Sequence, residues 1–478
     1  MLHGPIVAPD FREPMYLKSL TLENVKCFGK STLSFPHDEE GGYAGWNVLL
    51  GVNGTGKSTL LQAMALAMLG PISGGRLLQV PATWVRTGAS FGQIEAELVH
   101  NPTIDSISTG QPRKSPYAVK LLVSGERPVS VQGLDMVQPQ IAQVPSLAKS
   151  LNAGPYSGRH GWFSAGYGPF RRLSGGGGEE NASILFGGGR EARHLTLFRE
   201  SAALTNCEKW LASLHNQSVD PSLAEGLRHS AQEHLNIARD VIDSLLPSGV
   251  KVSEVSSLGV IFRAPSGAQV AISQLSDGFR SFLALTIDLL RQILDAGMLD
   301  GWEPMGGGQP ARIQVEGVVL IDEADTHLHP SWERDIGFRL CSVFPKIQFV
   351  VSAHSPFVAQ AARPGGLFLV EAAEDGCVEV DVAAESVRGW RADQILLSPL
   401  FGLVSTRDPE TEALLQAYDD LKSAGSLGNI ASARLAELES QLKGRLTAPG
   451  DSLAERNRSS EMQAFIDARL AKWADKKA

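Results

Sequence analysis

Gly51, Gly56, Lys57 and Ser58 have the spacing G-x-x-x-x-G-K-S, which is the pattern of a phosphate-binding loop. Glycines let the backbone of such a loop turn several N–H groups toward one anion, and the helix that follows adds the positive end of its dipole. Lys57 would supply a positive charge to the β- and γ-phosphates of ATP, and Ser58 a hydroxyl ligand for Mg²⁺. The predicted nucleotide-binding residues are Asn53, Gly54, Thr55, Gly56, Lys57, Ser58 and Thr59.

Two acidic residues, Asp322 and Glu323, directly follow an apolar run that ends at Ile321. Because ligands of open parallel sheets bind at the carboxyl ends of strands, we expect this pair to lie beside the phosphate loop. Asp322 is then expected to hold Mg²⁺, and Glu323 to act as the general base for the attacking water. His354 ends the next apolar strand, from which it could reach the γ-phosphate. The predicted catalytic residues are therefore Glu323 and His354.

The segment Leu275-Ser276-Asp277-Gly278 opens a further predicted helix, with Ser276 as its N-cap and an apolar stripe that begins at Phe279. The N-terminus of this helix is another potential anion site. One chain does not need two such sites for one nucleotide, so the residues alone give this segment no role within a single chain.

The hydrophobic patterns around these motifs alternate between strand and helix, which predicts an α/β fold with a mixed sheet and flanking helices. Two strands are expected within Met15–Phe35, with a turn at Phe28-Gly29-Lys30. A helix is expected over Ser58–Leu69, ending at Gly70-Pro71. The other expected strands are Asn47–Leu50, Gly92–Val99, Ala118–Val123, Ile313–Ile321, Gln348–Ser352, Leu367–Val370 and Val378–Val382.

Composition divides the chain into four parts. Residues 1–100 carry the phosphate loop and residues 256–385 the other motifs, and the family resemblance given below implies that they are the two halves of one P-loop ATPase head. Residues 101–255 between them are predicted to be an inserted region of loops and helices. Residues 386–478 become helical and charged, and we interpret them as a C-terminal accessory or partner-docking segment.

The bulk composition excludes several classes of protein. The 478 residues carry a net charge of −9, so any contact with nucleic acid must come from a local basic patch. The four cysteines are scattered without a C-x-x-C pair, which argues against structural zinc and a disulfide framework and favours the cytoplasm. The first residues lack the features of a signal peptide, and no apolar run reaches the length of a membrane span, so no membrane partner is expected.

The combination GVNGTGKST, LSDGF, VVLIDEADTHLHP and VVSAHSP resembles the ABC-type ATPases of the SMC, RecF and Rad50 kind. In that family the LSDG segment is the signature motif and closes on ATP held by a second subunit. The resemblance therefore implies a homodimer or higher homo-oligomer in which Ser276, Asp277 and Gly278 contact the partner's nucleotide. It covers roughly residues 15–100 and 260–360.

The chain departs from that family at several positions. Transporter ATPases usually carry glycine at the position of Asp277, and His329 stands where the D-loop often has aspartate. The glutamine that completes the Mg²⁺ shell is not evident. Gln93 is one interpretation, although it opens a predicted strand, and the region Tyr167–Arg171 is another.

A fuller resemblance is to the small AAA-type bacterial ATPases without long coiled-coil arms, of the kind found in Septu-type anti-phage systems. Gly166-Tyr167-Gly168-Pro169-Phe170-Arg171-Arg172 and Gly389-Trp390-Arg391-Ala392-Asp393-Gln394-Ile395 are similar to motifs of that group. The resemblance implies a separate effector, such as an HNH-type nuclease. This agrees with the lack of an acidic cluster for DNA cleavage in residues 360–478.

Other interpretations stay open. A RecF-type DNA-repair or DNA-clamp ATPase would need a basic groove, for which the scattered cations Arg171, Arg172, Arg190, Arg193 and Lys251 are available. A transporter ATPase subunit and a non-catalytic ATP-dependent scaffold fit the motifs less well. Asp325, His327 and His329 could be metal ligands only in an extended segment, and a loop that contacts the dimer partner is the favoured interpretation.

Overall fold

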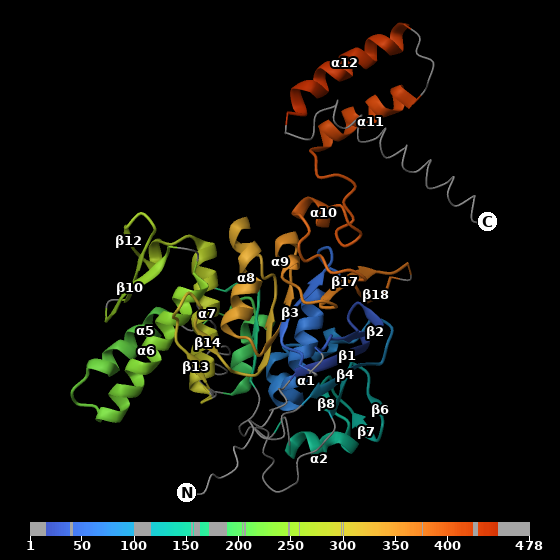
Figure 1. The fold of residues 1–478 in the computed structure, drawn as a ribbon. Coiled ribbons are helices and arrows are strands. Elements are labelled where there is room, and N and C mark those ends of the chain that lie inside the picture. The colour runs from blue at the N-terminus through green and yellow to red at the C-terminus, as the bar shows by residue number, and fades with distance from the viewer. Residues whose placement is uncertain are drawn as a thin grey trace, which may run out of the picture. The chain divides into compact units, whose positions relative to one another are not determined.

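The computed structural model describes residues 16–447, except 39–41, 100–115, 154–155, 157–162, 172–188, 203, 205–206, 247–248, 258, 298, 300, 375 and 424–428. The chain divides into two compact units, Met1–Ile395 and Leu396–Ala478. The first unit contains all strands of the described residues (Figure 1). None of the helices in the described part of the chain combines the length and apolar composition needed to cross a bilayer.

A six-stranded sheet forms the centre of the first unit, in the order β18-β17-β3-β16-β15-β9. Its strands are β18 (Val378–Val382), β17 (Leu367–Ala372), β3 (Gly45–Leu50), β16 (Ile347–Ser352), β15 (Gly317–Ile321) and β9 (Phe163–Tyr167). All neighbours run parallel except β17 and β18, which form the predicted hairpin. Strands β9, β15 and β16 are buried at every position, as expected for strands covered on both faces. The mixed sheet of the predicted fold class is therefore confirmed.

An antiparallel sheet lies beside it, in the order β2-β1-β4-β5-β8. Its strands are β2 (Phe28–Ser34), β1 (Tyr16–Val25), β4 (Phe91–Val99), β5 (Tyr117–Ser124) and β8 (Ile141–Gln143). The predicted turn at Phe28-Gly29-Lys30 is wrong, because Phe28 already pairs with Val25 and Lys30 pairs with Glu23. The chain turns at Lys26 and Cys27 instead, where Lys26 adopts a left-handed φ of 48°.

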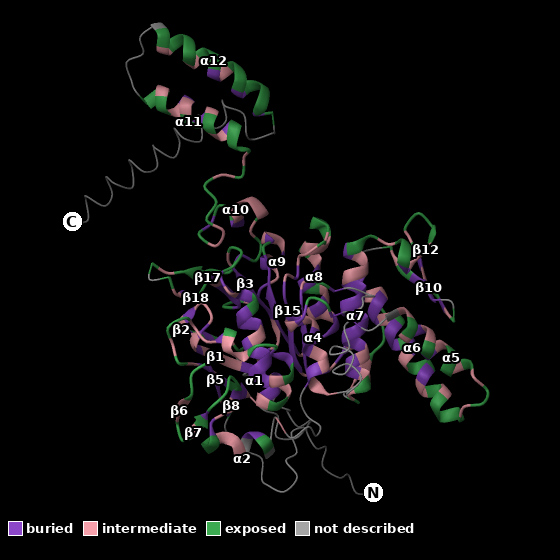
Figure 2. Cartoon of the chain, turned by 180° about the vertical axis from the view of Figure 1, so that it is seen from behind, coloured by how far each residue is buried: buried purple, intermediate pink, exposed green. Residues whose placement is uncertain are grey.

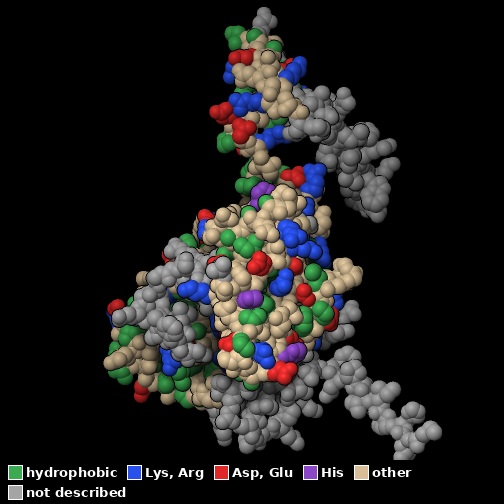
Figure 3. All heavy atoms as spheres, turned by 90° about the vertical axis from the view of Figure 1, so that its left-hand side faces the viewer, with side chains coloured by type: hydrophobic (Ala, Val, Ile, Leu, Met, Phe, Trp, Pro, Cys, Tyr) green, Lys and Arg blue, Asp and Glu red, His purple; other side chains and the backbone are tan. Residues whose placement is uncertain are grey.

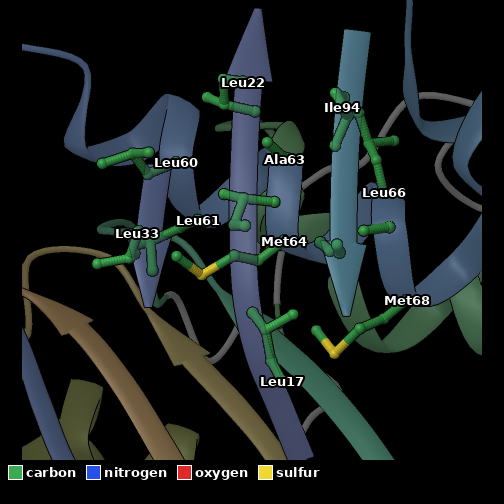
Figure 4. Packing of buried hydrophobic residues seen from close by; sticks show 14 of the residues in the cluster. Leu17, Leu22, Leu33, Leu60, Leu61, Ala63, Met64, Leu66, Met68 and Ile94 are labelled. Atoms are coloured by element: carbon green, nitrogen blue, oxygen red, sulfur yellow. The ribbon is translucent and has the colours of Figure 1, made fainter. Parts of the chain in front are cut away.

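Helix α1 (Lys57–Leu77) packs against both sheets and supplies much of the main hydrophobic core. Figure 4 shows its Leu61, Met64 and Met68 beside Leu17 and Leu22 of β1. The helix continues beyond the predicted end, because Gly70 makes a kink with φ 76° and the chain becomes helical again from Pro71. A proline is tolerated there because the first residue of a helical segment has no N–H partner to lose.

Alternating residues of β3 face different helices. Leu49 belongs to the core around α1, whereas the indole of Trp46 donates to the carbonyl of Val358 in α9 (Pro356–Gln360) at 3.2 Å. On that face Gly337 of α8 (Pro330–Val343) packs so closely on Trp46 that an added Cβ would lie 3.0 Å from the indole. The sheet is therefore covered on both faces, and Figure 2 shows its strands as the most buried part of the unit.

The inserted region contains two helices on either side of Pro221, α5 (Cys207–Val219) and α6 (Glu225–Leu245). The small antiparallel sheet β10 (Lys251–Ser256), β11 (Gly259–Arg263) and β12 (Gln269–Ala271) precedes α7 (Asp277–Asp295). The predicted strand over Ile313–Ile321 is two strands in the structure, β14 (Arg312–Ile313) and β15. The remaining elements are short: η1 (Pro81–Trp84), β6 (Val129–Val131), β7 (Leu134–Met136), α2 (Pro145–Ala153), η2 (Arg190–His194), α4 (Leu195–Phe198), η3 (Ile272–Gln274) and β13 (Trp302–Glu303).

The segment around Trp390 packs on its own chain. The side chain of Gln360 donates to the carbonyl of Trp390 at 2.7 Å, and the guanidinium of Arg388 lies 5.3 Å from the ring centre of Phe338 in α8. Residues 386–395 of the predicted accessory segment thus lie in the first unit. The second unit begins in α10 (Ala392–Leu396) and contains the helical hairpin α11 (Pro409–Ser423) and α12 (Asn429–Arg445), which share the core residues Leu415, Tyr418, Leu438 and Leu442.

Candidate nucleotide-binding site

The phosphate loop connects β3 to α1, with Val52, Asn53 and Gly54 exposed at its tip. Lys57 folds back over the loop, and its ammonium donates to the carbonyls of Gly51 at 2.7 Å and Val52 at 2.9 Å. The structure therefore places the lysine charge inside the loop, at the N-terminus of a long helix. Of the other predicted residues, Ser58 is exposed on the first turn of α1, and Thr55 and Thr59 are buried.

Gly56 shows why the loop needs glycine. It has a left-handed φ of 92°, which is costly for residues with a side chain. An added Cβ would also lie 2.6 Å from the sulfur of Cys27 and 2.9 Å from the ring of Phe28. The β1–β2 turn thus packs directly against the outer side of the phosphate loop, so a ligand would bind on the inner side of the loop.

Asp322 lies at the carboxyl end of β15 and is 4% exposed. Strand β16 stands between β15 and β3, so the acidic pair is one strand removed from the phosphate loop. Ser352, the last residue of the intervening strand β16, contacts both acidic residues. Its hydroxyl donates to Asp322 Oδ1 at 2.5 Å and accepts the backbone N–H of Glu323 at 2.8 Å.

Glu323 has a left-handed backbone, with φ 48°. Its carboxylate accepts the hydroxyl of Thr326 at 2.9 Å, and its backbone carbonyl accepts Nη2 of Arg171. Non-glycine residues in this conformation persist only where their surroundings hold them, and they cluster at functional sites. The general base predicted from sequence therefore sits on a turn that is held from several sides.

Arg171 approaches that turn from the segment after β9, the edge strand next to β15. It is 4% exposed and donates from Nε to the carbonyl of Gly168 at 3.2 Å and from Nη2 to the carbonyl of Asp322 at 3.1 Å. Burial lowers the pKa of Arg171 to about 10, and Asp322, Asp325 and Glu323 oppose that shift. The guanidinium remains a cation at neutral pH and faces three carboxylates.

The same acidic residues act on Lys57. Burial lowers the pKa of the Lys57 ammonium, and Asp322, Glu323 and Asp325 counteract this by favouring its charged form. The phosphate loop follows β3 and the acidic pair follows β15, and both strands run parallel to β16, so the two motifs lie at the same edge of the sheet.

His354 is exposed just beyond β16, at the edge where the acidic pair lies. Its backbone N–H donates to Asp325 Oδ2 at 2.9 Å. The other carboxylate oxygen of Asp325 is buried and has no hydrogen-bond partner among the described residues. The loop after Glu323 thus fixes the backbone of His354 and leaves its imidazole exposed.

The segment Leu275-Ser276-Asp277-Gly278, called the signature segment below, packs on the loop after Glu323 within the same chain. Ser276 occupies the N-cap position of α7 as predicted, although its hydroxyl forms no capping bond within the described residues. A Cβ on Gly278 would lie 1.9 Å from the backbone oxygen of His327, so only glycine fits there. Asp277 is exposed and pairs with Arg280.

The structure separates the two interpretations of the missing glutamine. Gln93 lies in β4 of the antiparallel sheet, where its amide donates to Glu95 at 2.9 Å. The segment Tyr167–Arg171, by contrast, follows β9 beside the acidic strand.

Among the described residues no three His, Cys, Asp or Glu side chains form a metal-binding group. His329 instead caps α8 through Nδ1, which accepts the N–H of Ser331 at 3.2 Å.

Sequence reasoning did not identify Ser352 and Thr326, the hydroxyl partners of the acidic pair. Ser352 closes the apolar run QFVVS, a position at which a polar residue in a parallel strand could have drawn attention. Thr326 lies in the loop for which the sequence favours a contact with the dimer partner over a metal site. Neither residue type is specific enough to indicate such a role without the fold.

Comparison with known families agrees with this geometry. A sequence model described as an AAA domain, putative AbiEii toxin, type IV TA system, matches residues 219–359. A second AAA-domain model matches residues 19–117. The first match includes the signature segment, the acidic pair and His354, and the second includes the phosphate loop.

The sequence relatives include Septu and retron proteins. The Septu protein PtuA of Bacillus mycoides is 24% identical over 404 residues, which cover 84% of this chain and 47% of PtuA. PtuA of Bacillus thuringiensis is 29% identical over 37% of this chain and 44% of its own length. The Retron Ec83 probable ATPase of Escherichia coli is 32% identical over 39% of this chain and 32% of its own length. The chain spans about half the length of the PtuA proteins that it matches.

Solved structures include an SMC head domain from Thermotoga maritima, 15% identical, with a TM-score of 0.41 over 77% of this chain and 99% of that domain. The ATP-bound recombination mediator RecF is 14% identical, with a TM-score of 0.39 over 79% of this chain and 100% of RecF. The chain therefore has a P-loop ATPase fold, resembles AAA-domain proteins over residues 19–117 and 219–359, and resembles the Septu protein PtuA over most of its length.

Proposed function

We propose that the protein hydrolyses ATP to ADP and phosphate at the sheet edge formed by the phosphate loop, Asp322, Glu323 and His354. The observation that carries the proposal is that the phosphate loop and the acidic pair follow β3 and β15, two strands parallel to β16 and on either side of it, so that both motifs lie at the carboxyl ends of one sheet. A nucleotide phosphate would meet the exposed loop tip and the N-terminus of α1 there.

The residues present suit Mg²⁺, since the Ser58 hydroxyl and the Asp322 carboxylate are oxygen ligands, which this ion prefers. Those two side chains would hold the ion. When bound, the ion offsets the charge of the phosphates and orients them. Glu323 would accept a proton from the attacking water, Lys57 would stabilise the charge of the transferred phosphoryl group, and His354 would bind its oxygens.

We further propose that two copies close around ATP, with Ser276, Asp277 and Gly278 of one copy on the nucleotide of the other. The support is that α7 offers a second helix N-terminus with exposed polar residues, packed on the loop that follows Glu323. The position of α7 would thus respond to the nucleotide state of the neighbouring copy.

The proposed biological role is control of a separate effector, such as an HNH-type nuclease, in anti-phage defence. This rests on the resemblance to the Septu protein PtuA and to the retron ATPases. We propose that the partner docks on the second unit, whose helical hairpin has a small core of its own.

The test is affinity isolation of the tagged Glu323→Gln protein from its native host in Mg-ATP, followed by mass spectrometry. The variant should bind ATP with unchanged affinity and release phosphate about 10²–10⁴-fold more slowly, because it lacks a general base. A stoichiometric nuclease in the isolate would support effector control. Normal phosphate release would remove Glu323 as the base, and isolation with DNA alone would favour the RecF-like alternative.

The structure weakens that alternative at one position. Arg171, one of the cations available for a DNA groove, is buried and bound to backbone carbonyls. On the face shown in Figure 3, basic and acidic side chains are interspersed. A protein that neutralises several DNA phosphates loses affinity steeply with salt, so a DNA affinity that does not depend on salt would exclude the clamp interpretation.

A further inference from the structure

We infer that the segment Tyr167–Arg171 is a positioning element for the acidic pair, in which Arg171 holds the backbone of Asp322 and Glu323 and Tyr167 ties this backbone to the signature helix α7. The inference rests on the proposed ATP hydrolysis and concerns the contacts that Arg171 and Tyr167 make with the backbone of the acidic pair and with α7.

The first step is the geometry of the Arg171 guanidinium. Its Nη2 donates to the carbonyls of both Asp322 and Glu323, and its Nε donates back to Gly168 in its own segment. The side chain therefore joins the end of β9 to the turn that carries both carboxylates. A planar fork of donors suits this task, whereas a lysine can offer only a compact ammonium group.

The second step is the conformation that this contact maintains. Glu323 has a φ of 48°, and the contact from Arg171 falls on the carbonyl of this same residue. If the carbonyl were released, the turn could relax toward ordinary backbone angles and rotate the Glu323 carboxylate away from a bound water. A displacement of about 1 Å at a general base is enough to reduce turnover about 100-fold.

The third step links the segment to α7. The backbone carbonyl of Tyr167 accepts the N–H of Asp322 at 2.8 Å, and its phenol donates to Asp288 Oδ2 at 3.2 Å. Asp288 is buried in α7 and also accepts from Arg291 at 3.0 Å. One residue therefore contacts the acidic strand through its backbone and the signature helix through its side chain. Movement of α7 would reach the acidic pair by this route.

The experiment compares Arg171→Lys, Arg171→Ala and Tyr167→Phe with the unmodified protein, by ATP affinity, steady-state turnover and thermal unfolding. We expect ATP affinity to stay within about threefold, because none of these side chains belongs to the phosphate loop. Turnover should fall about 10-fold in Arg171→Lys and about 100-fold in Arg171→Ala. Tyr167→Phe should fall by a few fold, and its loss should not be additive with that of Arg171→Lys, since both act through one segment.

The matched control is Arg199→Lys. Arg199 is also buried, at 9% exposure, and donates to a backbone carbonyl, that of Arg76, at the far end of α1. It should keep its turnover. Should Arg171→Ala fail to fold, Arg171→Lys and Tyr167→Phe still decide the question.

Unchanged turnover in Arg171→Lys, equal losses of affinity and turnover, or an equal loss in Arg199→Lys would overturn the inference. Lack of phosphate release by the unmodified protein would instead overturn the proposed ATP hydrolysis.

Discussion

Ser352 connects the two acidic residues through one hydroxyl group. It donates to the Asp322 carboxylate and accepts the N–H of Glu323. It therefore orients the Asp322 side chain and holds the backbone of Glu323, where the left-handed turn begins. Hydrogen bonds to charged groups contribute more than neutral ones, about 1.5–3 kcal/mol each. At the scale of single residues, the site therefore depends on side chains that perform no chemistry themselves.

The corresponding prediction concerns Ser352→Ala. It should lower turnover about 10- to 100-fold, because the lost bond to a carboxylate frees Asp322 and the backbone of Glu323. Steady-state phosphate release measures this, with ATP affinity as the second readout. Ser124→Ala is the control, since Ser124 is a fully buried strand serine whose hydroxyl donates to Gln138 at 2.9 Å. Its variant should lose stability but retain turnover, and equal losses of turnover would contradict the assignment.

At the scale of elements, the contact between α7 and the loop after Glu323 decides whether the signature segment and the acidic pair move together. Gly278, at the second position of α7, leaves no space for a side chain against the backbone of His327. Rings reinforce the contact further along, where Phe279 and Phe282 of α7 lie 4.5 and 5.4 Å from the ring centre of Trp332 in α8. The start of α7 is therefore joined to the acidic side of the site by backbone and aromatic packing.

Gly278→Ala should separate α7 from this loop. Overpacking against a backbone costs about 1–3 kcal/mol, and here the neighbouring atom is a carbonyl that cannot change rotamer. We expect a lower Tm and a loss of ATP-dependent self-association, measured by thermal unfolding and sedimentation. Gly226→Ala is matched to it, because Gly226 is the second residue of α6 and an added Cβ there meets no atom within 4 Å. Similar behaviour of the two variants would contradict the close-packing argument.

At the scale of the whole molecule, the proposed dimer closed around ATP requires that each nucleotide be shared by two chains. The phosphate loop and the signature segment would then belong to different copies at each site, as in a symmetric dimer with two equivalent sites. A defect in either motif would inactivate both sites when all chains carry it.

Mixing two defective variants tests this directly. Lys57→Ala should lose ATP binding, and Ser276→Arg should bind ATP but not complete the site of its neighbour. A mixed dimer contains one site with both motifs intact, so the mixture should recover turnover that neither variant shows alone. The measurement is phosphate release as a function of mixing ratio, and an absence of recovery in two folded variants would exclude the shared site.

The sequence by itself determined the phosphate loop, the acidic pair, most strands of the two larger sheets and the α/β class, but it did not indicate β9 at the edge of the central sheet. These features follow from local glycine spacing and from apolar periodicity, which depend on neighbours along the chain. The same local reasoning misplaced the β1–β2 turn by two residues and ended α1 at Gly70. Both errors concern residues with left-handed φ, a conformation that the patterns of hydrophobicity do not show.

Only the tertiary structure decided which strands meet. It placed β16 between the two motif strands, brought Ser352 and Arg171 to the acidic pair, and left Gln93 in the other sheet. Arg171 and Asp322 are separated by 151 residues, and no local pattern records a contact between them. A buried guanidinium needs acceptors from whatever backbone the fold brings near it, so its partners exist only once the sheet has assembled.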